Sequence, residues 1–204
     1  MTDIPIIFSA PMVRALLEGR KTMTRRLAWS NPVGLDIMHH EAGALVHRGW
    51  KVSGEDDTGH RIGWRPSPWQ KVKAGDRLYV RENFYTEGGA SRKSFGFAAD
   101  IPAHQHPPRL IPCIHMPRRL SRLTLVVTAT KIERLQNISE VDAVAEGIEQ
   151  TDFWRDDHPA SICFSMLWDA LHGDAAAWRL DPHVVALSFR VIKANVDSPE
   201  ARAQ

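Results

Sequence analysis

The chain has 204 residues, of which 43% are hydrophobic and 25% are charged, and its formal net charge is +2. This length is enough for one domain with a substantial core, and the absence of an 18-residue apolar run excludes a transmembrane helix. Cys113 and Cys163 are too few for a disulfide framework, and the first twenty residues lack the pattern of a secretory signal, so we expect a cytoplasmic protein.

The first predicted element is a short helix between Ser9 and Gly19. Ser9 is suited to the N-cap, and Pro11 falls in the first turn, where its missing N–H costs little. Apolar residues recur on one face at helical spacing, namely Met12, Val13, Leu16 and Leu17. Gly19 suits the C′ position, so the basic segment GRKTMTRR (residues 19–26) begins where this helix ends.

Two strands are predicted in the middle of the chain. The segment GDRLYVREN (residues 75–83) has a turn followed by alternating apolar residues, and RLTLVVTATKIERL (residues 122–135) is rich in β-branched residues. The sequence near residues 30–70 and 86–110 shows no sustained period and is rich in turn-forming residues. We interpret these two segments as inserts made of loops and short hairpins.

Two helices follow the long predicted strand. The first has a capping-box-like start at Ser139 and ends at Gly147, just after Glu146. The second runs from Ser161 to His172 and has one apolar face.

A final apolar strand is predicted at HVVALSFRVIK (residues 183–193), and the small, polar tail of residues 194–204 is predicted to be disordered. Long strands with helices at either end predict a single α+β domain over residues 1–193, either compact or a partly open β-barrel.

Charge is distributed unevenly along the chain. Residues 1–134 contain 21 Lys and Arg against 12 Asp and Glu, a net charge of +9, whereas residues 135–204 contain 5 against 12, a net charge of −7. A basic region of this kind predicts a polyanion partner such as nucleic acid. The alternative is that the acidic part folds against the basic part, and composition leaves both open.

Histidines and cysteines do not form a recognisable metal site. The closest groupings are His39 with His40, His104 with His106, and Cys113 with His115, and none has the spacing of a zinc module. The chain also lacks a phosphate-binding glycine loop and a G-x-S-x-G motif. We therefore expect neither a metal nor a cofactor.

Lys21 and Thr24 are the leading candidates for chemistry. A hydroxyl becomes a nucleophile when a base takes its proton, and a lysine can be that base if desolvation or nearby cations favour its neutral form. Positions 21 and 24 of a regular strand point to opposite faces, so a shared site requires a turn or bulge between them. The alternative is a phosphate-contact patch or a solvated surface.

Several segments, in this order, resemble an ASCH domain of the longer phage- and prophage-borne type: FSAPMVRALLEGRKTMTRR, GDRLYVRE, IHMPRRLSRLTLVVTATKIERLQNISEVDAVAEGI and LWDALHG…VVALSFRVI. The resemblance covers most of residues 4–193 outside the two inserts. It implies a PUA-like, partly open β-barrel with flanking helices, related to modules that bind RNA or modified bases.

The resemblance also implies a catalytic set. One small bacterial branch of the family hydrolyses N4-acetylcytidine with a lysine, a threonine and a glutamate. The lysine and threonine lie in a G-R-K-T-x-T segment that matches Lys21 and Thr24, and the glutamate lies in the helix after the long strand, where Glu146 stands here. Lys21 would be the base, Thr24 the nucleophile, and Glu146 the group that protonates the leaving nitrogen.

Five arginines are expected to contact phosphate, namely Arg20, Arg25, Arg26, Arg118 and Arg119. The leading hypothesis is a metal-independent amidohydrolase that removes an N-acyl group from a cytosine-type base of a modified nucleoside or nucleic acid. The alternatives are a non-catalytic RNA- or DNA-binding module, in which the same cations neutralise phosphates, and a nuclease.

Overall fold

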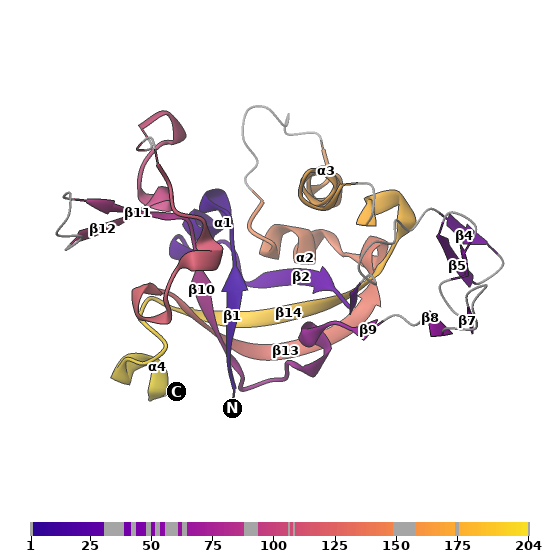
Figure 1. The fold of residues 1–204 in the computed structure, drawn as a ribbon, viewed down its shortest axis with the longest axis horizontal. Coiled ribbons are helices and arrows are strands. Elements are labelled where there is room, and N and C mark those ends of the chain that lie inside the picture. Colours follow the sequence, from indigo (N-terminus) through magenta and orange to yellow (C-terminus); the bar gives the residue numbers. More distant parts are fainter. Residues whose placement is uncertain are drawn as a thin grey trace. The chain divides into compact units, whose positions relative to one another are not determined.

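The protein has an α+β architecture in this computed structural model, as the sequence predicted (Figure 1). The structure describes residues 2–30, 39–41, 44–47, 50–51, 54–55, 61–62, 65–87, 94–105, 107, 109–148, 158–173 and 176–203. The chain divides into two compact units. Unit 1 comprises Met1–Met23, Lys73–Ala129 and Ser188–Gln204, and unit 2 comprises Thr24–Val72 and Thr130–Leu187.

A mixed five-stranded sheet has the strand order β1–β10–β13–β14–β2. Its strands are β1 (Asp3–Ile7), β10 (Arg77–Arg81), β13 (Thr124–Arg134), β14 (His183–Ile192) and β2 (Met23–Leu27). Strand β1 runs parallel to β10, and β10 runs antiparallel to β13. The described residues form no closed barrel, so the α+β class is confirmed while the PUA-like barrel stays a prediction.

Unit 1 contains the first predicted helix. Helix α1 (Ala10–Leu17) begins after Ser9, buries Val13 and Leu16 on its apolar face, and is followed by Gly19 at a φ of +79°. That left-handed conformation is one that glycine adopts without strain, which explains why the helix ends there. The prediction of this helix is confirmed.

The insert near residues 86–110 is partly regular in unit 1. Strands β11 (Phe84–Glu87) and β12 (Ser94–Phe97) form an antiparallel pair in which Phe84 lies opposite Phe97. The ring of Tyr85 lies across Gly96, where a Cβ atom would come within 2.1 Å of the ring. The close approach of this ring explains why a glycine stands within an aromatic strand.

The C-terminal tail differs from the predicted disorder. Residues Pro199–Arg202 form helix α4, in which the Ser198 hydroxyl caps the backbone N–H of Ala201. Val196 is fully buried, and Arg77 Nη1 donates hydrogen bonds to the carbonyl oxygens of Val196 and Ala201 at 3.1 and 3.2 Å. A buried guanidinium needs acceptors, so Arg77 orders a segment whose own sequence lacks an apolar period.

Unit 2 contains most of β2 and the two predicted helices, α2 (Glu140–Ala145) and α3 (Ala160–His172). Short strands lie in the insert near residues 30–70: β3 (Trp29–Ser30), β4 (His39–Glu41), β5 (Ala44–His47), β6 (Trp50–Lys51), β7 (Gly54–Glu55), β8 (Arg61–Ile62) and β9 (Arg65–Pro66). Pairing is antiparallel, with β3 against β9, β5 between β4 and β6, and β7 against β8.

Helix α2 has its predicted cap at Ser139, helix α3 begins one residue before the predicted Ser161, and the two share one apolar core. The Ser139 hydroxyl accepts a hydrogen bond from the backbone N–H of Asp142 at 3.1 Å, as a capping serine does. Helix α3 packs Phe164 and Trp168 into this core, and the Trp168 indole donates a hydrogen bond to the carbonyl of Ala176 at 2.7 Å. No helix in the described part of the chain is long and apolar enough to span a membrane.

Candidate functional site

Three side chains of the basic segment GRKTMTRR are buried, namely Lys21, Thr24 and Arg25. Lys21 makes an isolated β-bridge, Thr22 stands outside regular structure, and β2 begins at Met23. Lys21 is 2% exposed and Thr24 is 1% exposed. The regular strand therefore begins only after position 22, and the interpretation as a solvated surface does not hold for the side chains of Lys21 and Thr24.

Lys21 belongs to unit 1, where it lies against an aromatic ring. Its Nζ is 5.5 Å from the centroid of the Phe8 ring, and its backbone N–H donates a hydrogen bond to the carbonyl of Ala15 at 3.1 Å. Burial removes the amine from bulk water, where its charged form is most stable.

Thr24 belongs to unit 2, where a cation contacts its hydroxyl. Arg26 Nη1 donates a hydrogen bond to Thr24 Oγ1 at 3.0 Å, and the Arg26 guanidinium lies 5.8 Å from the centroid of the Trp69 ring. Burial lowers the pKa of Arg26, and the negative charge of Glu146 opposes that change. A cationic donor on a hydroxyl oxygen stabilises negative charge that develops there, as nucleophilic attack demands.

Arg25 is the centre of a group that we call the ion cluster, formed by Arg25, Lys131, Glu133, Asp142 and Glu146 in unit 2. The Arg25 side chain is fully buried, and its Nη2 donates to Glu133 Oε1 at 2.8 Å and to Asp142 Oδ2 at 2.9 Å. Its Nη1 donates to Glu146 Oε1 at 3.2 Å. Lys131 Nζ contacts Asp142 at 3.0 Å and Glu133 at 3.2 Å.

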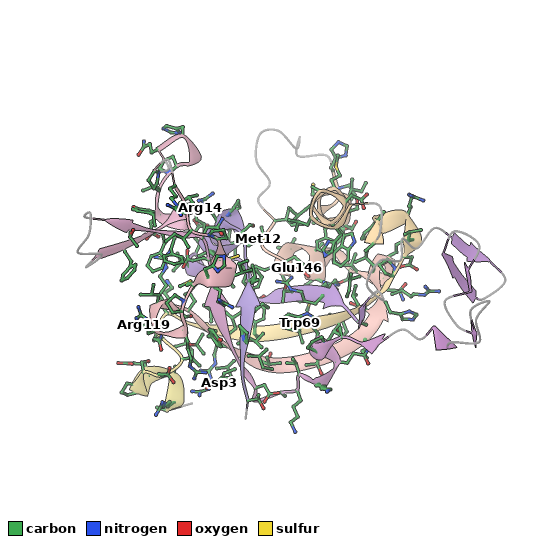
Figure 2. All side chains as sticks on the ribbon, in the orientation of Figure 1. Asp3, Met12, Arg14, Trp69, Arg119 and Glu146 are labelled. Carbon is green, nitrogen blue, oxygen red and sulfur yellow. The ribbon has the colours of Figure 1, made fainter. Side chains whose placement is uncertain are left out.

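Glu146 occupies an unfavourable place for a carboxylate. It is the C-cap residue of α2, lies beside β2 and is 4% exposed (Figure 2). The C-terminus of a helix carries partial negative charge, and Asp142 stands one turn earlier on the same helix. Arg25 offsets both repulsions. Local conflicts that the rest of a protein must offset are typical of functional positions.

The predicted phosphate contacts have different surroundings. Arg118, in unit 1, donates to Asp197 at 2.8 Å, pairs with Asp3, and lies 5.3 Å from the centroid of the Tyr79 ring. Hydrogen bonds to Asp197 and Asp3 raise the pKa of Arg118, and Arg118 lowers the pKa of Asp197 to about 2. These internal ion pairs occupy Arg118, so we no longer place it among the phosphate contacts.

Arg25 is also removed from the predicted phosphate contacts, because its buried guanidinium forms ion pairs with three carboxylates. Arg20 pairs with Glu18 and is partly exposed. Arg119, labelled in Figure 2, is exposed and makes no hydrogen bond or ion pair with the residues that the structure describes. Arg119 therefore fits a phosphate contact better than Arg25 or Arg118 does.

The sequence interpretation overlooked the acidic part of the ion cluster. Asp142 falls within the predicted helix that follows Ser139, and Glu133 falls within the predicted strand of residues 122–135. Their spacings did contain a signal, since Asp142 and Glu146 are four apart on one helix face, and Lys131 and Glu133 are two apart on one strand face. No group of three metal-ligating side chains that could hold an ion occurs in the described ranges, and His106 lies outside them.

No protein-family model matches the chain, and no curated protein matches it. Among solved structures, the chain is similar to the crystal structure of protein EF3133 from Enterococcus faecalis V583, of family DUF984. The identity is 15%, the match covers 97% of this chain and 84% of that chain, and the TM-score is 0.36. A similarity this low carries no argument about fold or function, so the resemblance to ASCH domains stays a prediction.

Proposed function

We propose that the protein is an ASCH-domain amidohydrolase that recognises a modified nucleoside, free or within a nucleic acid, and removes an N-acyl group from its cytosine-type base. The observation that carries this proposal is the hydrogen bond from Arg25 to Glu146 at 3.2 Å. It joins positions 121 residues apart and ties Glu146 to strand β2, which also contains Thr24. Thr24 and Glu146, two members of the proposed catalytic set, thus lie in unit 2 on elements that a hydrogen bond connects.

The proposed reaction proceeds through a threonine ester. Lys21, as the neutral amine, takes the Thr24 proton while Thr24 Oγ1 bonds to the acyl carbon of the substrate. The acyl C–N bond then breaks, and Glu146 supplies the proton to the leaving nitrogen. Water next bonds to the acyl carbon and gives one proton to Glu146. The ester C–O bond then breaks, Lys21 returns its proton to Thr24 Oγ1, and a carboxylic acid is released. Overall, the amide and water yield an acid and the amino form of the base.

Burial of the reacting groups supports this assignment. Thr24 is shielded from solvent and accepts its hydrogen bond from a cation, Arg26. The Trp69 ring beside Arg26 offers an aromatic surface of the kind on which bases stack. Lys21 precedes Thr24 by three residues and is also buried.

The proposal is tested with a panel of N-acylated nucleosides and short RNAs incubated with the protein and separated by chromatography. We expect an N4-acylcytidine to be converted into cytidine and the free acid, while the RNAs stay intact. Release of shorter oligonucleotides would instead identify a nuclease. Binding of RNA or DNA with no conversion of any substrate would identify a non-catalytic binding module.

A binding role makes its own prediction at the exposed Arg119. We expect Arg119→Ala to weaken binding of single-stranded RNA or DNA irrespective of sequence, and to reduce the slope of log affinity against log salt by about 1. Arg118→Ala is the matched comparison, because it removes the cation that Asp3 and Asp197 share, leaves them paired with Arg77 and Arg202, and should lower the melting temperature. An Arg119→Ala protein with an unchanged salt titration would remove this residue from any phosphate-binding surface.

A further inference from the structure

The ion cluster contains a cation that the proposed reaction does not use. We propose that Arg25 is a positioning residue, which fixes the orientation of the Glu146 carboxylate for hydrolysis, and this inference rests on the function proposed above. The Arg25 side chain is fully buried and cannot meet a phosphate on the surface. Its contacts are with carboxylates on β13 and α2 instead.

The geometry of the guanidinium explains how one side chain positions another. Nη2 donates to both Glu133 and Asp142, at 2.8 and 2.9 Å. A guanidinium is planar and rigid, so two bonds to one nitrogen fix the plane and the place of the other nitrogen. Nη1 therefore has one position, from which it donates a hydrogen bond to Glu146. The Phe164 ring also lies near the guanidinium, with its centroid 5.9 Å from the guanidinium carbon.

Lys131 contacts the same two carboxylates as Arg25 Nη2, at the more exposed side of the ion cluster. It contacts the same pair, Glu133 and Asp142, and so closes a ring of alternating charges with Arg25. Burial alone would raise the pKa of Asp142, but hydrogen bonds from Lys131 and Arg25 outweigh it and leave that pKa lowered. Asp142 consequently stays ionised near neutral pH and keeps Arg25 in place.

Lys131 and Arg25 both add positive charge to the ion cluster, but they differ in their contact with Glu146. Within the described part of the chain, the contacts of Lys131 run to Glu133 and Asp142 and do not include Glu146. Arg25 contacts all three carboxylates. Removing Lys131 changes the charge of the cluster and leaves the Arg25–Glu146 hydrogen bond, whereas removing Arg25 breaks that bond. Lys131→Met is therefore a matched control for Arg25→Gln.

The first test measures kcat and KM on the acylated nucleoside that the wild type hydrolyses. We expect Arg25→Gln to lower kcat about a hundredfold with KM within about threefold of wild type, because the misplaced group acts in the transition state. Arg25→Lys keeps the charge without the planar fork and should lose about tenfold in kcat. Lys131→Met should stay within about threefold. Wild-type kcat in Arg25→Lys, or an equal loss in Lys131→Met, would overturn the inference.

Arg25→Gln leaves excess negative charge buried and can therefore destabilise the fold. A second variant separates that loss of stability from a loss of catalysis. Arg25→Gln combined with Glu133→Gln removes one charge of each sign and so keeps the net charge of the cluster. We expect this double variant to regain most of the melting temperature of the wild type without regaining kcat. Recovery of kcat together with the melting temperature would reduce Arg25 to a purely structural role.

A third measurement needs no activity, and so separates failure of this inference from failure of the proposed function. A double-mutant cycle between Arg25→Lys and Glu146→Gln, followed by urea unfolding, should show coupling of about tenfold in the unfolding constant. The corresponding cycle between Lys131→Met and Glu146→Gln should show less than about twofold. If Arg25 and Glu146 are uncoupled, the inference fails whatever the enzyme assay shows. If they are coupled and no panel substrate is hydrolysed, Arg25 still positions the Glu146 side chain, and the hydrolytic function is what fails.

Discussion

Lys21→Met and Thr24→Val are each expected to lower hydrolysis of an N-acylated nucleoside by at least about a thousandfold, because each removes half of a nucleophile–base unit. Residues that act as one unit are not additive, so the double variant should be scarcely slower than either single variant. The measurement is single-turnover kinetics, with a circular-dichroism melt to show that each variant folds.

Lys21→Arg is the variant that separates the two interpretations of the basic segment. Arginine keeps the positive charge, but it cannot act as a neutral base near neutral pH. If Lys21 is the base, Lys21→Arg should bind substrate and fail to hydrolyse it. If the segment only holds phosphate, Lys21→Arg should largely restore the affinity that Lys21→Met loses. Full hydrolytic activity in Lys21→Arg would rule out the catalytic lysine.

Local signals explain why the helices were predictable from the sequence. Ser9 precedes α1 and Gly19 follows it, and Ser139 and Gly147 stand in the same places around α2. Residues of these types cap or terminate helices, so the ends of both helices can be predicted from the sequence. Strand β13 was predictable because its β-branched residues give a local pattern as well. These features depend on neighbours in the sequence, which a single sequence displays.

Features that depend on distant partners were not predictable in the same way. Strand β2 contains the adjacent arginines Arg25 and Arg26, and carboxylates more than 100 positions away offset the buried charge of Arg25. Helix α4 likewise depends on Arg77, which lies 119 positions before Val196. The resemblance to a family pointed to Glu146, but the cation that holds this glutamate became visible only in the fold.

Arg122→Met is expected to lower the free energy of unfolding by about 3 kcal/mol at neutral pH, because it leaves a buried carboxylate without its cation. Arg122 makes a bidentate pair with Glu82, Nε to Oε1 at 2.8 Å and Nη2 to Oε2 at 3.0 Å. The Glu82 side chain is 1% exposed and the Arg122 side chain is 27% exposed, so water cannot replace the lost donor at Glu82. Arg122 also pairs with Asp100 and stacks 4.2 Å from the centroid of the Phe97 ring.

Acidification should reduce the loss of unfolding free energy in Arg122→Met. The direction of this pH dependence follows from the pKa of Glu82. Burial raises the pKa of Glu82 above its ordinary value, and Arg122 opposes the rise. The folded protein therefore holds the Glu82 proton more tightly than the unfolded chain, and stability falls as pH rises through the window between the two values. Removing Arg122 extends this window to higher pH.

Urea unfolding at pH 7 and at about pH 4 measures the effect. The deficit of Arg122→Met against wild type should be largest at pH 7 and should shrink at the lower pH, where Glu82 becomes neutral. Arg122→Met combined with Glu82→Gln is the matched control, since it removes the buried charge and should regain most of the loss at pH 7. A deficit that is the same at both pH values, or one that the double variant keeps in full, would show that Arg122 stabilises unit 1 through packing on Phe97 rather than through its charge.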